Sequence, residues 1–156
     1  MTDKAASVAT LSDAPAATIL VIDDDPAMRT ILCFTLRSFG YLALVAGEGN
    51  EALQIAQDHP EIRMIILDVV MPGLSGRKLA DQLQIMLPQA AILFCSGHAA
   101  DAMSLHGIDP NSVHFMQKPC RPPELQSKVE ELLTVRNSPP LFEVSPHSGL
   151  RPPNGG

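Results

Sequence analysis

The chain has 156 residues, 46% of them hydrophobic and 18% charged, which is typical of one globular domain. Its formal net charge of -6 argues against a direct binder of nucleic acid or of anionic membranes, because both need a basic face. The apolar runs are shorter than the ~18 residues of a membrane span, and the first residues lack a signal peptide's order, so we expect a cytoplasmic protein.

Apolar runs alternate with segments of helical spacing from Thr18 onward. Five strands are predicted, at residues 18–25, 41–46, 62–68, 90–96 and 113–117. Each is followed by a predicted helix, at residues 26–40, 49–60, 74–87, 99–107 and 122–137. The strand runs are almost continuously apolar, as in strands that are covered on both faces. This pattern predicts an α/β fold, a doubly wound, five-stranded parallel sheet with helices on both faces.

The two ends of the chain differ from the middle in composition. Residues 1–17 are predicted to be a flexible arm, and residues 137–156, rich in Pro, Gly and Ser, a disordered tail. Residues 18–136 are therefore expected to form the single domain. The three cysteines, Cys33, Cys95 and Cys120, include no CxxC pair, and each is interpreted as a reduced core or surface thiol rather than a nucleophile.

Polar residues stand where several of the predicted strands end. The first strand is closed by three acids, the third by one acid and the fourth by a serine, and a lysine follows the fifth: Asp23, Asp24, Asp25, Asp68, Ser96 and Lys118. The carboxyl ends of parallel strands form one edge of a sheet, and ligands bind there in open α/β folds. These six residues are thus expected to lie on one rim.

A carboxylate cluster of this kind predicts a cation site. Two carboxylates ~4 Å apart repel each other by ~4 kcal/mol at an effective dielectric near 20, so the cluster must bind a proton or a cation. All the available ligands are oxygens, which favours Mg2+ or Mn2+ over zinc. Lys118 could pair with Asp68 or with a phosphoryl oxygen, and the Ser96 hydroxyl could hydrogen-bond a second phosphoryl oxygen. The whole set indicates phosphoryl transfer to Asp68.

These motifs resemble those of the receiver domain of bacterial two-component response regulators. The resemblance covers about residues 18 to 136 and rests on "VIDDD", "ILDVVMPGLSG", "FCSG" and "FMQKP" in that order. It implies that Asp68 accepts a phosphoryl group from a sensor histidine kinase or a histidine phosphotransfer protein. It also implies that Asp24 binds Mg2+ directly, that Asp23 assists, and that the backbone carbonyl of Val70 is a further ligand. Asp25 is interpreted instead as a loop or helix-capping residue.

The resemblance further implies a switch around the phosphoryl group. Lys118 would contact the group and precede a cis bond to Pro119, while Ser96 would move toward the group and Phe115 would change rotamer. Gly97 would leave room for the phosphoryl group. A plain packing role for Phe115 is the alternative interpretation.

Two positions indicate that the phosphorylated form decays slowly. Val70, two residues after Asp68, cannot orient an attacking water by hydrogen bonding, and His98 replaces the acidic or amide residue often found two positions after the serine. We therefore expect these two residues to modulate the lifetime of the phosphoryl group.

Other functions remain open at this point. A phosphohydrolase of the haloacid-dehalogenase type also uses an aspartate nucleophile, but it usually carries a second acid where Val70 stands. A pseudo-receiver that only binds partners is a further alternative. With no output segment expected after residue 137, the signal could pass to an unidentified protein target, or the chain could be a phosphate shuttle or sink.

Overall fold

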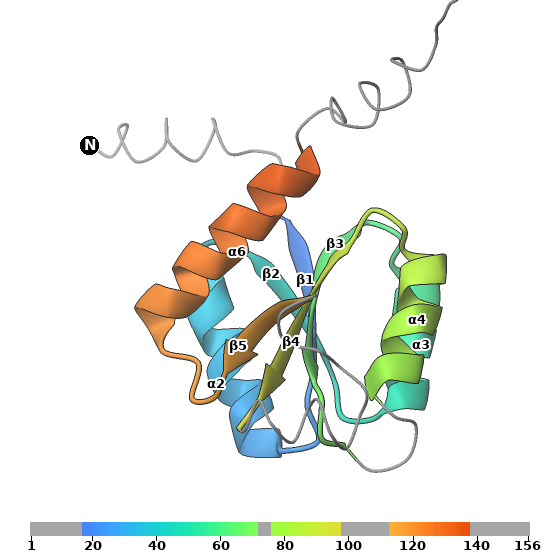
Figure 1. Ribbon diagram of the computed structural model, residues 1–156, viewed down its shortest axis with the longest axis horizontal. Coiled ribbons are helices and arrows are strands. Elements are labelled where there is room, and N and C mark those ends of the chain that lie inside the picture. Colours follow the sequence, from blue (N-terminus) through green and yellow to red (C-terminus); the bar gives the residue numbers. More distant parts are fainter. Residues whose placement is uncertain (1–16, 72–75, 98–112, 138–156) are drawn as a thin grey trace, which may run out of the picture.

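The computed structural model describes residues 17–71, 76–97 and 113–137 of the chain (Figure 1). This part contains five strands and four helices. In chain order they are β1 (Thr18–Ile22), α2 (Pro26–Ser38), β2 (Leu42–Ala46), α3 (Gly49–Asp58), β3 (Ile62–Asp68), α4 (Gly76–Met86), β4 (Ala91–Ser96), β5 (His114–Gln117) and α6 (Pro122–Asn137).

The strands form one parallel sheet in the order β2-β1-β3-β4-β5. Strand β2 pairs with one edge of β1, and β3 then pairs with the other edge, so that β1 lies between them. The order of the strands therefore reverses between β1 and β3, and in open parallel sheets a ligand crevice forms outside the carboxyl ends of such a pair.

Two apolar layers hold helices on the two faces of the sheet, with α3 and α4 on one side and α2 and α6 on the other (Figure 1). Alternate residues of β1 serve different layers: Leu20 and Ile22 pack toward α3 and α4, and Ile19 and Val21 pack toward α2 and α6. All four side chains are at most 1% exposed. This burial on both faces explains why the strand sequences are apolar without alternation.

The start of α2 fixes the path of the chain as it leaves β1. The Asp25 side chain caps the helix by accepting a hydrogen bond from the Ala27 backbone N–H at 3.0 Å, and Pro26 occupies the first turn. After the helix, Gly40 has φ +97, a conformation that glycine adopts without steric cost. The interpretation of Asp25 as a capping residue is confirmed.

The predicted fold class is confirmed by this sheet and its two helical layers. The predicted helix at 99–107, nearly all of the predicted arm, and all but the first residue of the predicted tail lie outside the described residues. The proposed domain limits of 18 and 136 stay a prediction.

Candidate functional site

The candidate site lies at the carboxyl ends of β1 and β3, where the strand order reverses. Asp23 directly follows β1, and Asp68 is the last residue of β3. Both carboxylates are buried, with exposed fractions of 2% and 6%. Burying two carboxylates side by side opposes folding unless positive charge compensates them, so the site has a functional rather than a packing explanation.

A third acid completes the cluster. Asp23, Asp24 and Asp68 each offer one carboxylate oxygen, and these three oxygens lie within 4.8 Å of one another. Asp24 is exposed, so the cluster is open to solvent on one side. An all-oxygen ligand set with an open side fits Mg2+, which prefers a few carboxylates and retains several waters. The predicted cofactor agrees with the chemistry of these donors.

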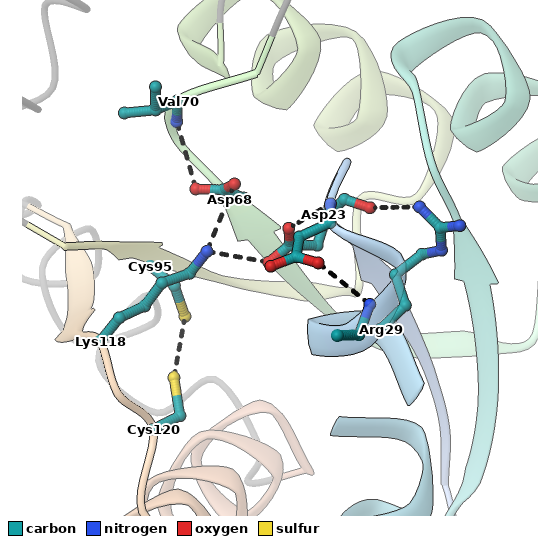
Figure 2. Close-up of polar contacts among 9 residues, drawn as sticks. Asp23, Arg29, Asp68, Val70, Cys95, Lys118 and Cys120 are labelled. Atoms are coloured by element: carbon teal, nitrogen blue, oxygen red, sulfur yellow. Dashed lines mark hydrogen bonds and ion pairs between the residues drawn. The ribbon is translucent and has the colours of Figure 1, made fainter. Parts of the chain in front are cut away.

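Lys118 forms ion pairs with two carboxylates of the acidic cluster. Its Nζ lies 2.9 Å from Asp23 Oδ2 and 3.3 Å from Asp68 Oδ2, between the two carboxylates (Figure 2). Three carboxylates and one ammonium leave a formal charge of two negative units, which one divalent cation neutralises. The pair with Asp68 was expected, whereas the shorter pair with Asp23 was not predicted from the sequence.

The acidity of Asp68 reflects these surroundings. Burial and the nearby charge of Asp23 raise its pKa from 3.8 to about 6, against the opposing effects of Lys118 and of the Val70 N–H. This N–H donates a hydrogen bond to Asp68 Oδ1 at 3.2 Å. The carboxylate is thus mostly ionised at neutral pH and offers an electron pair for nucleophilic attack.

Arg29 in α2 supports the backbone of the site, a role that the sequence did not reveal. Its Nη1 donates a hydrogen bond to the backbone carbonyl of Asp23 at 2.8 Å (Figure 2). The guanidinium lies over Gly47, where an added Cβ would approach Nη1 to 2.7 Å. Glycine at this position thus leaves room for Arg29 beside the end of β1.

Of the remaining predicted residues, Ser96 and Gly97 lie on the same rim, and Phe115 lies within β5. Ser96 ends β4 and is buried, and its carbonyl accepts a hydrogen bond from the Lys118 N–H at 2.8 Å. Gly97 is exposed, and a Cβ added there would meet no described atom within 4 Å. Phe115 in β5 is partly buried against the core layer of α3 and α4. The Lys118–Pro119 bond is cis, as expected, and His98 lies outside the described residues.

Two thiols from distant parts of the sequence form a pair near the site, and no CxxC motif announces this pair. Cys95 directly precedes Ser96, and Cys120 follows Lys118 by two residues. Their Sγ atoms are 3.8 Å apart and share a hydrogen bond, which raises the pKa of Cys95 and lowers that of Cys120 (Figure 2). Because each cysteine is within two residues of a rim residue, the sequence could have placed both thiols near the site.

The doubly wound parallel sheet, with three acids and a lysine at the carboxyl ends of its strands, is the arrangement expected of a protein that accepts phosphoryl groups. The family model of the response regulator receiver domain matches residues 19–130. The chain belongs to this family, whose members are phosphoacceptor regulators rather than classical enzymes. The match makes the phosphohydrolase the weaker interpretation. The pseudo-receiver is disfavoured on other grounds, because the acidic cluster and its lysine are both in place.

Individual relatives support this assignment. The tetrathionate response regulatory protein TtrR of Salmonella typhimurium is 32% identical over 122 residues, which cover 78% of this chain and 59% of that protein. The sensor kinase CckA of Brucella abortus is 33% identical over 118 residues, 75% of this chain and 12% of that protein. The chain thus spans about half the length of several curated relatives and a small part of another.

One solved structure with the same fold contains Mg2+-BeF. The response regulator TrrA of Thermotoga maritima in complex with Mg2+-BeF matches with a TM-score of 0.64 and 29% identity, over 74% of this chain and 98% of that one. A separate observation concerns membranes. No helix within the described ranges of this chain has the length and apolar content needed to cross a bilayer.

Proposed function

We propose that the chain receives a phosphoryl group on Asp68 from the phosphohistidine of a sensor histidine kinase or a histidine phosphotransfer protein. The observation that carries this proposal is the position of Lys118 Nζ between the buried carboxylates of Asp23 and Asp68, beside the exposed Asp24. This arrangement concentrates negative charge at one solvent-facing point and provides one cation to pair with an incoming phosphoryl group.

In the proposed reaction, a carboxylate oxygen of Asp68 forms a bond to phosphorus while the bond between phosphorus and the donor's imidazole nitrogen breaks. The electron pair of the broken bond returns to the imidazole. Asp23, Asp24, Asp68 and the Val70 carbonyl would hold Mg2+, which neutralises phosphoryl oxygens when bound. Lys118 would exchange its pairing with Asp68 for a phosphoryl oxygen, because phosphorylation changes the charge that it faces.

The downstream step is part of the same proposal. Ser96 at the end of β4 and Phe115 in β5 would respond to the new phosphoryl group, with Gly97 leaving space beside it. Phe115 is only partly buried at the edge strand, so a change of its rotamer would alter the adjacent surface. We propose that this surface binds a protein target in the cytoplasm, and that passing the phosphoryl group to another histidine protein is the alternative.

Incubation with acetyl phosphate and Mg2+, followed by intact-mass measurement, tests the phosphorylation step. We expect the parent to gain the mass of one phosphoryl group, lost again on treatment with hydroxylamine, and we expect no gain in Asp68→Asn or in EDTA. Asp25→Asn is the matched control, since it changes an acid next to the cluster but keeps a good helix cap. If the parent gains no labile phosphate in Mg2+, the proposal fails.

A further inference from the structure

Cys95 and Cys120 form a thiol pair that the proposed phosphorylation does not use. Their sulfur atoms lie 3.8 Å apart although the residues are 25 positions apart in sequence. In Figure 2 the two sulfurs face each other, and Cys120 lies on the same connection as Lys118, between β5 and α6. The third cysteine, Cys33, lies on α2. The fold therefore brings together two of the three thiols.

The two residues differ in how firmly they are held. Cys95 is 2% exposed in β4, between β3 and β5, and its carbonyl accepts a hydrogen bond from the Val69 N–H at 2.9 Å. Cys120 is partly exposed in the short connection between β5 and α6. An S–S bond of ~2.05 Å requires the sulfur atoms to approach by nearly 2 Å, and the connection is the part that can move. Cys120 is also the thiol that an oxidant in solvent can reach.

We propose that Cys95 and Cys120 are a redox modification site, in which peroxide converts the pair into an intramolecular disulfide beside the phosphoacceptor. In the first step the Cys120 sulfur attacks one peroxide oxygen, the O–O bond breaks and water leaves after proton transfer, giving a sulfenic acid. In the second step the Cys95 sulfur attacks the Cys120 sulfur, the S–O bond breaks and a second water leaves. In total the protein loses two protons and two electrons, and the peroxide gains them as it becomes two waters.

The disulfide would act on the phosphorylation site through Lys118. Cys120 lies two residues after Lys118, and Cys95 is paired in register with Asp68 across β3 and β4. The new bond would therefore draw the segment that carries Lys118 toward the strand next to Asp68. Since the ammonium contacts Asp23 and Asp68 at 2.9 Å and 3.3 Å, a shift of this segment weakens at least one contact. This regulatory effect rests on the proposed function, whereas formation of the disulfide does not.

The first experiment detects the bond itself. The reduced full chain is treated with hydrogen peroxide, alkylated and digested without reductant for peptide mass mapping. We expect a peptide cross-link between Cys95 and Cys120, with Cys33 alkylated. Cys33→Ser should form the same cross-link, and Cys120→Ser should form none. A cross-link through Cys33, or accumulation of sulfinic acid on Cys120 without a cross-link, would overturn the proposal.

The second experiment measures the effect on phosphorylation by acetyl phosphate and Mg2+. We expect the cross-linked parent to be phosphorylated several-fold more slowly than the reduced parent, and dithiothreitol to restore the rate. Cys120→Ser exposed to the same peroxide controls for other oxidative damage and should keep its rate. An unchanged rate in fully cross-linked protein would overturn the regulatory effect. If even the reduced parent is not phosphorylated, the proposed function fails, and the cross-link map still decides the modification site.

Discussion

Lys118 forms its shorter ion pair with Asp23, at 2.9 Å, and this pair joins residues 95 positions apart in sequence. The second contact of the same ammonium, with Asp68, is 3.3 Å. Lys118 thus neutralises part of the charge on Asp23, a proposed metal ligand, as well as on Asp68, the proposed acceptor. The lysine is a structural counterion of the site before any phosphoryl group arrives.

Replacement of Lys118 should reveal this counterion role. In Lys118→Gln the two buried carboxylates lose their cation, and we expect the free energy of unfolding without metal to fall by roughly 3 kcal/mol. Mg2+ should then raise the melting temperature more in the variant than in the parent, because a divalent cation replaces the lost charge and no ammonium repels it. Thermal denaturation in EDTA and in Mg2+ measures both effects. An equal Mg2+-induced shift in the two proteins would show that Lys118 does not compensate the cluster.

The raised pKa of Asp68 predicts a pH-dependent cost to stability. With a pKa of about 6 in the folded protein against 3.8, the folded state holds more protons than the unfolded chain between these values. Asp68 therefore costs progressively more stability as the pH rises through this window, and the full cost applies above pH ~6. The shift corresponds to about 3 kcal/mol.

Asp68→Asn should remove that cost. We expect the variant to be more stable than the parent by about 1 to 3 kcal/mol at neutral pH in EDTA, with the difference vanishing near pH ~4. Urea denaturation across this pH range tests the prediction. A difference that does not change with pH would mean that the carboxylate is not destabilised by its surroundings.

The adjacent acids Asp24 and Asp25 should separate metal binding from helix capping. Asp25→Ala removes the cap of α2 and should lower the free energy of unfolding by about 1 kcal/mol, with Mg2+ affinity unchanged. Asp24→Ala removes an exposed cluster oxygen, so it should weaken Mg2+ binding and leave metal-free stability close to that of the parent. Calorimetric Mg2+ titration and urea denaturation give the two readouts. If Asp25→Ala weakened Mg2+ binding and Asp24→Ala lowered metal-free stability, the two roles would be the reverse of those proposed.

Arg29 and Gly47 should be energetically coupled. Arg29→Ala removes the donor to the Asp23 carbonyl and should cost about 1 kcal/mol. Gly47→Ala places a Cβ 2.7 Å from the guanidinium and should displace it at a similar cost. In the double variant the methyl group meets no guanidinium, so the two costs should not add. Additive losses in the double-mutant cycle would show that Gly47 matters for a reason other than Arg29.

Val70 should set the lifetime of the phosphorylated form. Its side chain is 48% exposed beside Asp68, and it offers no hydrogen bond to an attacking water. We expect faster loss of the phosphoryl group than in the parent both in Val70→Asn, whose amide can orient a water, and in Val70→Ala, whose smaller side chain lets water approach. Radiolabel or Phos-tag time courses measure these rates. Ile85→Asn, an exposed apolar residue near the end of α4, is the control and should decay like the parent. Equal rates in all four proteins would remove Val70 from the explanation.

The fold could be predicted from the sequence because strands that are buried on both faces are almost continuously apolar. Strand β3 reads "IRMIILD", without polar alternation, and such strands occur in parallel sheets covered by helices. Short segments of helical spacing between these runs then leave the doubly wound sheet as the simplest chain path. The position of Asp68 at the end of a buried strand was visible in the same way.

Three contacts of the site were decided only by tertiary structure. The pairing of Lys118 with Asp23, the support of Asp23 by Arg29, and the approach of Cys95 to Cys120 each join different elements of the fold. Residue type and spacing place such groups on one rim, but side-chain distances depend on how α2 and the connection after β5 pack against the sheet. The sequence by itself thus determined which residues share the carboxyl edge, and packing determined which of them touch, because atomic contacts between distant segments follow from the whole set of buried surfaces.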